Sequence, residues 1–166
     1  LTDWFQVQVL AGELQFSTSV LAAHAAHGQK MPELPEVETR VRQLRDPCID
    51  RTIQRVRIDW PRHIDTPSLT TFRRRIHGQR VADVLRRGKF LIFQLSEDAL
   101  LFHLRMSGDL YLAAEDAPAD RHAHTVLTLD NLEQLRFSDA RKFGRVYLVK
   151  AADEITAGLG PEPLSK

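Results

Sequence analysis

The sequence predicts a mainly β domain, a two-layer β-sandwich of about eight strands with a helix at each side, one of them at the amino-terminal end of the domain. Two observations lead to this class. The chain has 166 residues and 43% hydrophobic composition, enough to bury one real core. Most of its apolar residues fall in short runs of strand length separated by turn signals, and helical periodicity is rare.

The first 30 residues differ from the rest and are expected to be an extension outside the domain. They carry Asp3 and Glu13 where a signal peptide would be basic, and they end in an alanine-rich run before Met31. No apolar run in the sequence is long enough to span a membrane. A first helix belonging to the domain is the alternative interpretation of this segment.

Two helices are expected in the domain. From Pro35, apolar residues recur at Val37, Val41 and Leu44, which places a stripe on one helix face. Asp46-Pro47 is expected to end this helix. A second, short helix is predicted over residues 67 to 76, closed by Gly78.

The remaining apolar runs predict the strands. The alternation over residues 52 to 59 favours a half-buried strand, although Ile53 cannot face the same way as Val56 and Ile58 without a bulge. Seven further runs are expected to be strands: residues 81–85, 90–95, 100–104, 110–113, 125–129, 134–137 and 145–149.

Charge and cysteine content limit the function classes. Residues 31 to 89 hold 14 arginines and lysines against 8 acidic residues, an excess of six, and 13 of the 14 are arginine. Arginine donates paired hydrogen bonds to phosphate, so a nucleic-acid partner is plausible, although a solvated basic face is the commoner explanation. The single Cys48 excludes an internal disulfide and a cysteine-rich zinc site within this chain, and an intracellular protein is the simplest inference.

The segment Met31-Pro32-Glu33-Leu34-Pro35-Glu36-Val37-Glu38 could carry chemistry. Removal of Met31 by an aminopeptidase would make Pro32 the amino terminus, and a secondary amine that attacks a sugar aldehyde carbon gives an iminium electron sink. Glu33 beside it could act as a general acid or base. The simpler interpretation is that these residues open a helix, where proline and negative charge are favoured.

Other turns carry residues suited to DNA. Lys89, in Arg86-Arg87-Gly88-Lys89, can reach a phosphate, unless this is only a basic hairpin turn. Met106, in His103-Leu104-Arg105-Met106-Ser107-Gly108, can wedge between bases if it is not a core residue. Asp139-Ala140-Arg141-Lys142-Phe143-Gly144 could occupy the gap left by an extruded base. His122 and His124 form a weak metal signal with no third ligand, and phosphate contact or core hydrogen bonding is preferred.

Together these motifs, with Leu159-Gly160-Pro161-Glu162-Pro163-Leu164, resemble the formamidopyrimidine-DNA glycosylase family in the same order, from Met31 to about Lys166. Leu34, Arg141 and Phe143 make the chain more similar to that family than to endonuclease VIII, which usually has glycine in place of Leu34.

The resemblance implies a base-excision DNA repair enzyme that removes oxidised purines, such as 8-oxoguanine and formamidopyrimidines, and cleaves the strand as a lyase. It implies Pro32, carried by the amino-terminal helix, as the nucleophile at the sugar C1′ and Glu33 as the proton donor. It implies that Lys89 contacts the damaged nucleotide and its phosphate and supports elimination. It implies that Met106, Arg141 and Phe143 fill the void, with Arg141 facing the orphaned cytosine. His103 and His122 are expected to contact DNA.

The same resemblance sets the expected boundaries and partners. Residues 1–30 are the extension, 31–158 the catalytic domain and 159–166 the start of a linker; the family's helix-two-turn-helix domain and four-cysteine zinc finger lie beyond the last residue, so no cofactor is expected in this chain. Damaged double-stranded DNA is the expected partner of a monomer in the bacterial cytoplasm, associated with the nucleoid and not with a membrane.

While residues 1 to 30 stay attached, Pro32 is an amide and the chain is expected to be inactive as it stands. A DNA-binding remnant without catalysis is the alternative. A general single-strand binder is disfavoured, because only Trp60, Phe72 and Phe90 lie in or beside the basic region.

Overall fold

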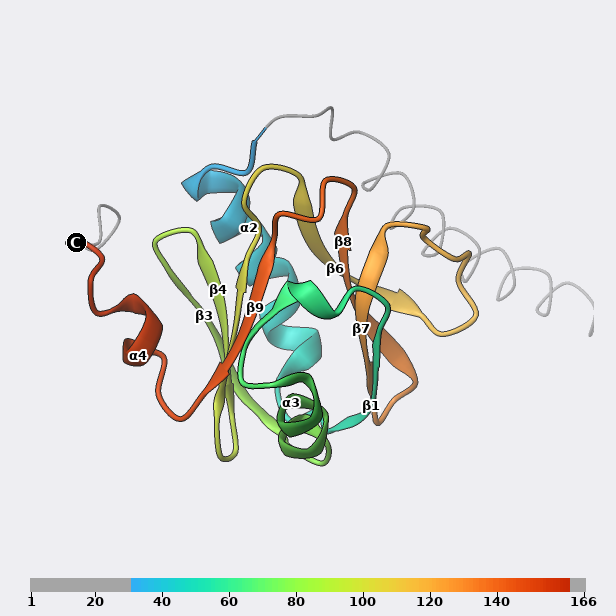
Figure 1. Cartoon of the computed structure of the whole chain (residues 1–166). Coiled ribbons are helices and arrows are strands. Elements are labelled where there is room, and N and C mark those ends of the chain that lie inside the picture. Colours follow the sequence, from blue (N-terminus) through green and yellow to red (C-terminus); the bar gives the residue numbers. More distant parts are fainter. Residues whose placement is uncertain (1–30, 162–166) are drawn as a thin grey trace, which may run out of the picture. The chain divides into compact units, whose positions relative to one another are not determined.

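The computed structural model describes residues 31–161, which form a β-sandwich with helices at its sides (Figure 1). In chain order the elements are α2 (Leu34–Cys48), β1 (Ile53–Ile58), the 3₁₀ turn η1 (Pro61–His63), β2 (Ile64–Thr66), α3 (Leu69–Ile76), β3 (Val81–Arg87), β4 (Phe90–Leu95), β5 (Ala99–His103), β6 (Gly108–Ala114), β7 (Ala123–Leu129), β8 (Glu133–Asp139), β9 (Arg145–Val149) and α4 (Asp153–Thr156). The predicted fold class is therefore confirmed. The expected extension over residues 1–30 and the end of the expected linker, residues 162–166, lie outside the described residues.

The strands form two sheets. One has the order β1-β7-β8-β6 and the other β2-β9-β5-β4-β3. All neighbouring strands pair antiparallel except β2 and β9, which are parallel. The main core lies between the sheets, where Phe93 and Phe102 of one sheet pack with Leu127 and Phe137 of the other.

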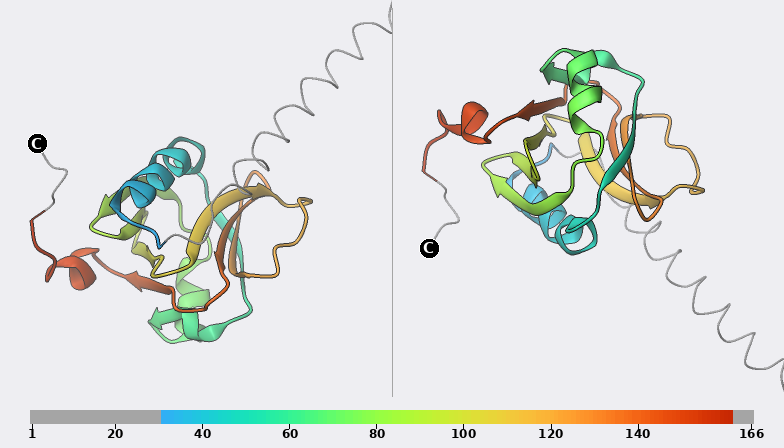
Figure 2. Two further views of the ribbon diagram at one scale, coloured as in Figure 1. Left: turned by 90° about the horizontal axis from the view of Figure 1, so that it is seen from above. Right: turned by 90° about the horizontal axis from the view of Figure 1, so that it is seen from below.

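The two predicted helices lie on opposite sides of the sandwich, as Figure 2 shows from above and below. The predicted stripe of α2 is buried, with Val37, Val41 and Leu44 at 7% exposure or less. The predicted end of α2 at Asp46-Pro47 was wrong by one residue, because the helix continues through Pro47 to Cys48. A proline so close to the end removes only one hydrogen bond, and burial of the Cys48 side chain stabilises this last turn.

The bulge anticipated near Ile53 is present in β1. The pairing of β1 with β7 shifts register between Ile53 and Arg55. Both Ile53 and Ile58 are buried although five positions separate them, which strict alternation does not allow. The bulge lets both ends of the strand contribute to the core.

Three short elements were not predicted: η1, β2 and α4, each of three or four residues. Such lengths carry too few residues for a periodic pattern. Ile155 of α4 packs on a second apolar cluster on the outer face of the five-stranded sheet, around Phe90, Leu101 and Tyr147.

The antiparallel connections gather several turns at one end of the sandwich. The turns β3–β4, β5–β6 and β8–β9 lie at the same end as the start of α2, the upper end in Figure 1. We call this the loop end. The turns β4–β5 and β7–β8 lie at the opposite end.

Candidate active site and nucleic-acid interface

The three predicted catalytic residues meet at the loop end. Pro32 is half-buried just before α2, and Glu33 is the residue that caps this helix. The Glu33 backbone N–H donates to Glu36 Oε2 at 3.1 Å, which fixes the chain direction at the helix start. Lys89, from the β3–β4 turn, places Nζ 3.2 Å from Glu33 Oε2. Both side chains remain exposed, at 41% and 46%, so a ligand can reach them.

The β3–β4 turn that carries Lys89 is braced against α2. Arg86, whose side chain is 6% exposed, donates to Glu38 Oε2 at 2.8 Å and to the Gly88 carbonyl at 3.1 Å. The hydrogen bond from Arg86 holds the pKa of the Glu38 carboxyl below its usual value, against the opposing effect of burial. Gly88 has a φ of +55°, a conformation that glycine adopts without strain. Lys89 is thereby held in reach of Glu33.

The three predicted void-filling residues stand on two neighbouring loops. Met106 is 42% exposed and Phe143 is 48% exposed, unusual for large apolar side chains. Arg141 places its guanidinium carbon 5.4 Å from the centre of the Phe143 ring, a cation–π contact. Pairing of Gly108 with Asp139, where β6 begins and β8 ends, brings the two loops side by side.

The predicted DNA-contacting histidines also lie at the loop end. His103 pairs across the sheet with Phe90, the residue after Lys89, and its Nδ1 accepts from the Arg105 N–H at 3.1 Å. Burial, helped by the charges of Arg105 and Lys89, lowers the pKa of His103 to about 4, so this ring is neutral at pH 7 and Nε2 carries the proton. His122 accepts at Nε2 from Arg121, and its carbonyl accepts from the Asp139 N–H at 2.9 Å.

Sequence reasoning missed several residues at this end. His63 of η1 is fully buried, and neither ring nitrogen has a hydrogen-bond partner. Lys142 lies over the Trp60 ring, with Nζ 4.3 Å from its centre. Asp139 is fully buried although it was expected only as the first residue of a loop. The positions of these three side chains depend on contacts between residues distant in sequence. The only indication in the sequence is the combination of positive charge and an aromatic residue in the β8–β9 loop.

The buried His63 predicts a pH-dependent stability. Burial lowers its pKa to about 4 from 6.5, outweighing the Asp139 carboxylate nearby. The unfolded chain therefore binds a proton that the folded chain does not between these values, and stability falls as pH drops from 6.5 to 4, by about 3 kcal/mol from this residue. His63→Phe should reduce the slope of the free energy of unfolding against pH over this range, and the slope that remains comes from other histidines with a lowered pKa, such as His103. His77→Gln, a change at an exposed histidine, should leave the profile intact, and an equal slope in all three proteins would contradict the assignment.

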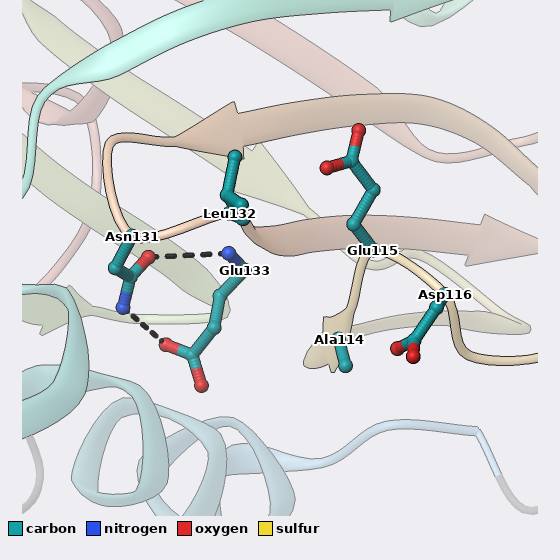
Figure 3. Close-up of a pocket in the computed structure, with 6 residues that line it drawn as sticks. All are labelled: Ala114, Glu115, Asp116, Asn131, Leu132 and Glu133. Carbon is teal, nitrogen blue, oxygen red and sulfur yellow. Dashed lines mark hydrogen bonds between the residues drawn. The ribbon is translucent and has the colours of Figure 1, made fainter.

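A hollow in the described structure lies away from this site. It is lined by Ala114, Glu115, Asp116, Asn131, Leu132 and Glu133, where Asn131 bonds both the side chain and the backbone of Glu133 (Figure 3). Ala114 pairs with Glu133 at the other end of the β6–β8 ladder from Gly108 and Asp139. Its acidic lining does not suit a phosphate backbone.

Neither a metal cluster nor a membrane span is found among residues 31–161. No group of three or more His, Cys, Asp or Glu side chains there could hold a metal ion, and His122 and His124 lie with ring centres 6.4 Å apart. None of the helices in this range is long and apolar enough to cross a membrane.

Comparison with known proteins identifies the family of this domain. Residues 31–146 match the family model described as the formamidopyrimidine-DNA glycosylase N-terminal domain. The chain therefore belongs to the formamidopyrimidine-DNA glycosylase family. The family predicted from the sequence motifs is confirmed.

Individual relatives show how much of such a protein is present. The formamidopyrimidine-DNA glycosylase of Symbiobacterium thermophilum is 47% identical over 139 residues, covering 81% of this chain and 46% of the relative. That of Bacillus subtilis is 41% identical over 138 residues, covering 80% and 50%. The chain thus spans about half the length of the curated relatives it matches.

Solved structures agree as well. The Lactococcus lactis formamidopyrimidine-DNA glycosylase bound non-covalently to DNA containing an abasic site superposes with a TM-score of 0.73 at 34% identity, over 80% of this chain and 52% of that one. The same organism's enzyme in complex with DNA containing a formamidopyrimidine lesion gives 0.69 at 35% identity, over 74% and 46%.

Proposed function

We propose that this domain acts in base-excision repair of oxidised purines such as 8-oxoguanine and formamidopyrimidines, with strand cleavage through a Schiff base on Pro32. The observation that carries this proposal is the contact of Lys89 with Glu33 beside Pro32, at the end of the sandwich where Met106 and Phe143 are exposed. Its support is the family membership and the relatives solved with damaged DNA. Damaged duplex DNA of the bacterial nucleoid is the proposed partner, and a monomer the proposed form.

The proposed chemistry begins with the Pro32 nitrogen. Its lone pair forms a bond to C1′ of the damaged nucleotide as the bond from C1′ to the base nitrogen breaks, and the electron pair of that bond leaves with the base. Glu33 donates the proton that the departing base needs. The Pro32 nitrogen then loses its proton to water, and its lone pair breaks the bond from C1′ to O4′, which takes up a proton as the sugar opens and the Pro32 iminium forms. The iminium acidifies the C2′ hydrogens, and loss of one as a proton breaks the C3′–O bond so that the 3′ phosphate leaves with its electron pair. Lys89 holds the nucleotide's phosphate during these steps.

In the proposed complex, DNA contacts the exposed side chains at the loop end. Met106 and Phe143 would take the space vacated by an extruded nucleotide, and Arg141 would hydrogen-bond the unpaired base opposite. His103 and His122 would contact the DNA backbone. Filling this space offsets the cost of unstacking, because apolar side chains replace the lost base contacts.

A second candidate, a DNA-binding remnant without catalysis, rests on one observation. In the 1–166 chain, a peptide bond joins Met31 to the Pro32 nitrogen, and an amide nitrogen has no lone pair free to attack C1′. We therefore propose that the 1–166 chain is inactive until residues 1–31 are removed.

Binding of the 1–166 chain to duplex DNA should be weak and salt-dependent, and Lys89→Ala should lower the salt slope of log Kd by about one unit because one phosphate contact is lost. The measurement is fluorescence anisotropy on an 8-oxoguanine duplex at several salt concentrations. The matched control is Lys150→Ala, which removes an exposed lysine just after β9 at the opposite end. Binding insensitive to salt, or equal slopes for the two variants, would contradict the placement of the DNA.

A further inference from the structure

The β5–β6 loop, which carries Met106, and the β8–β9 loop, which carries Phe143, both donate hydrogen bonds to one buried carboxylate. Asp139, at the end of β8, is fully buried and accepts three hydrogen bonds. Ser107 Oγ donates to Oδ1 at 2.5 Å and the Arg141 N–H to the same oxygen at 3.2 Å, while the Gly144 N–H donates to Oδ2 at 2.6 Å. We call these four groups the Asp139 bracket.

The bracket joins the loops directly. Ser107 follows Met106 in the β5–β6 loop, whereas Arg141 and Gly144 frame Phe143 in the β8–β9 loop. Ser107 Oγ also accepts from the Arg141 N–H at 3.2 Å, so one hydroxyl touches both the carboxylate and the second loop. Any shift of one loop against the other must break these hydrogen bonds.

The observed arrangement of the β8–β9 loop has no room for a side chain at Gly144. A Cβ at Gly144 would lie 2.4 Å from Phe137 Cζ and 2.9 Å from Asp139 Oδ2. Lys142 in this loop has a φ of +59° and Arg105 in the other a φ of +55°, both costly for residues with side chains. Hydrogen bonds to a charged carboxylate are strong enough to hold such conformations.

We propose that Asp139 is a positioning residue that sets Met106 relative to Arg141 and Phe143, and so determines how well the loop end recognises DNA with a missing or extruded base. The inference rests on the proposed function. Asp139 acts through the loops, since no part of its side chain is exposed to DNA.

A carboxylate is needed at this position because the bracket presents donors to both oxygens. In Asp139→Asn, the amide NH₂ must face either the Gly144 N–H or the Arg141 N–H, and one backbone hydrogen bond is lost in either orientation. Ser107→Ala removes the link between the loops, whereas Ser107→Thr keeps the hydroxyl. Ser96→Ala is the matched control. Ser96 lies in the β4–β5 turn at the opposite end of the sandwich, and its hydroxyl accepts a hydrogen bond from the Arg80 N–H.

The first arm of the test needs no DNA. In the 1–166 chain, amide hydrogen exchange is followed by NMR at Arg141 and Gly144. Ser107→Ala should speed exchange at Arg141, in the other loop, on the order of tenfold, and Asp139→Asn should do so at whichever of the Arg141 and Gly144 amides loses its acceptor. Ser107→Thr and Ser96→Ala should match the parent. Unchanged exchange in Ser107→Ala and Asp139→Asn would overturn the bracket itself.

The second arm measures the affinity for a duplex carrying a tetrahydrofuran abasic-site analogue opposite cytosine, divided by the affinity for the intact duplex. Asp139→Asn and Ser107→Ala should lower this ratio on the order of tenfold, with intact-duplex binding and its salt slope unchanged and recovery in Ser107→Thr. Equal loss on both duplexes, or an unchanged ratio, would overturn the positioning role. A parent without any preference for the abasic duplex would instead overturn the proposed function, with the exchange arm still deciding whether the bracket exists.

Discussion

A chain that begins at Pro32 is expected to form a borohydride-reducible covalent complex with damaged duplex DNA, and the 1–166 chain is expected to form none. The secondary amine of a free Pro32 can attack C1′ and give an iminium, which borohydride reduces to a stable amine. The amide nitrogen of Pro32 in the longer chain cannot. The difference should be nearly complete, because it concerns the presence of the nucleophile and not its position.

Removal of residues 1–31 should leave the fold intact. Every residue of the two apolar clusters in the described structure lies at Val37 or later in the chain. A chain begun at Met31, from which an aminopeptidase exposes Pro32, is therefore the natural test protein. Circular dichroism of both chains would check that they share one fold.

The strength of trapping should depend on the rest of the DNA grip. Because the chain spans about half the length of its relatives, the protein from Pro32 to Lys166 should trap weakly, and joining the C-terminal half of a full-length relative should increase trapping at least about tenfold. Pro32→Gly should weaken trapping in both. Equal trapping by the 1–166 chain, without cleavage at Met31, would contradict the role of the Pro32 amine.

Glu33→Gln is expected to slow release of 8-oxoguanine by about 10²- to 10⁴-fold in the chain that begins at Pro32 and carries the joined C-terminal half. Glutamine keeps the length of the side chain but has no proton to give, and it also loses the ion pair with Lys89. Excision is measured as released base in single-turnover experiments, which separate chemistry from DNA binding.

A preformed abasic site provides the control for this variant. Such DNA has already lost its base, so Glu33→Gln should trap on it far better than on 8-oxoguanine. Glu97→Gln, at an exposed glutamate in the opposite turn, should behave as the parent on both substrates. A variant impaired equally on the two substrates would show that Glu33 serves the structure or a later step and not departure of the base.

Elements with a clear local pattern were predictable from the sequence. The stripe of Val37, Val41 and Leu44 defined α2, and β4 and β9 have the predicted limits because turn residues bound their apolar runs. Strands β3, β6, β7 and β8 extend one or two residues beyond an end of their apolar runs, since backbone pairing continues past the last buried side chain. The predicted range of β1 was one residue too long at each end, and β5 begins and ends one residue earlier than predicted. Pro32, the proposed nucleophile, precedes α2, the helix that was expected to carry it.

The site was predictable in its composition but not in its contacts. Pro32, Glu33 and Lys89 were each identifiable from local motifs. The 3.2 Å contact of Lys89 with Glu33, however, joins residues 56 positions apart and depends on the packing of the β3–β4 turn against α2. The Asp139 bracket likewise joins β8 to Ser107 across 32 positions. His63 gave no signal, since a lone histidine in a basic stretch does not show whether it will be buried.

The most direct test of the account is to locate the DNA-derived sugar on the protein after borohydride reduction. The chain that begins at Pro32 is trapped on a duplex carrying 8-oxoguanine, digested with a protease, and the modified peptide is sequenced by mass spectrometry. The account predicts the added mass on the nitrogen of Pro32, in the peptide that continues into Glu33 and Leu34. Attachment to Lys89 Nζ, or to any other lysine, with Pro32 unmodified would contradict it.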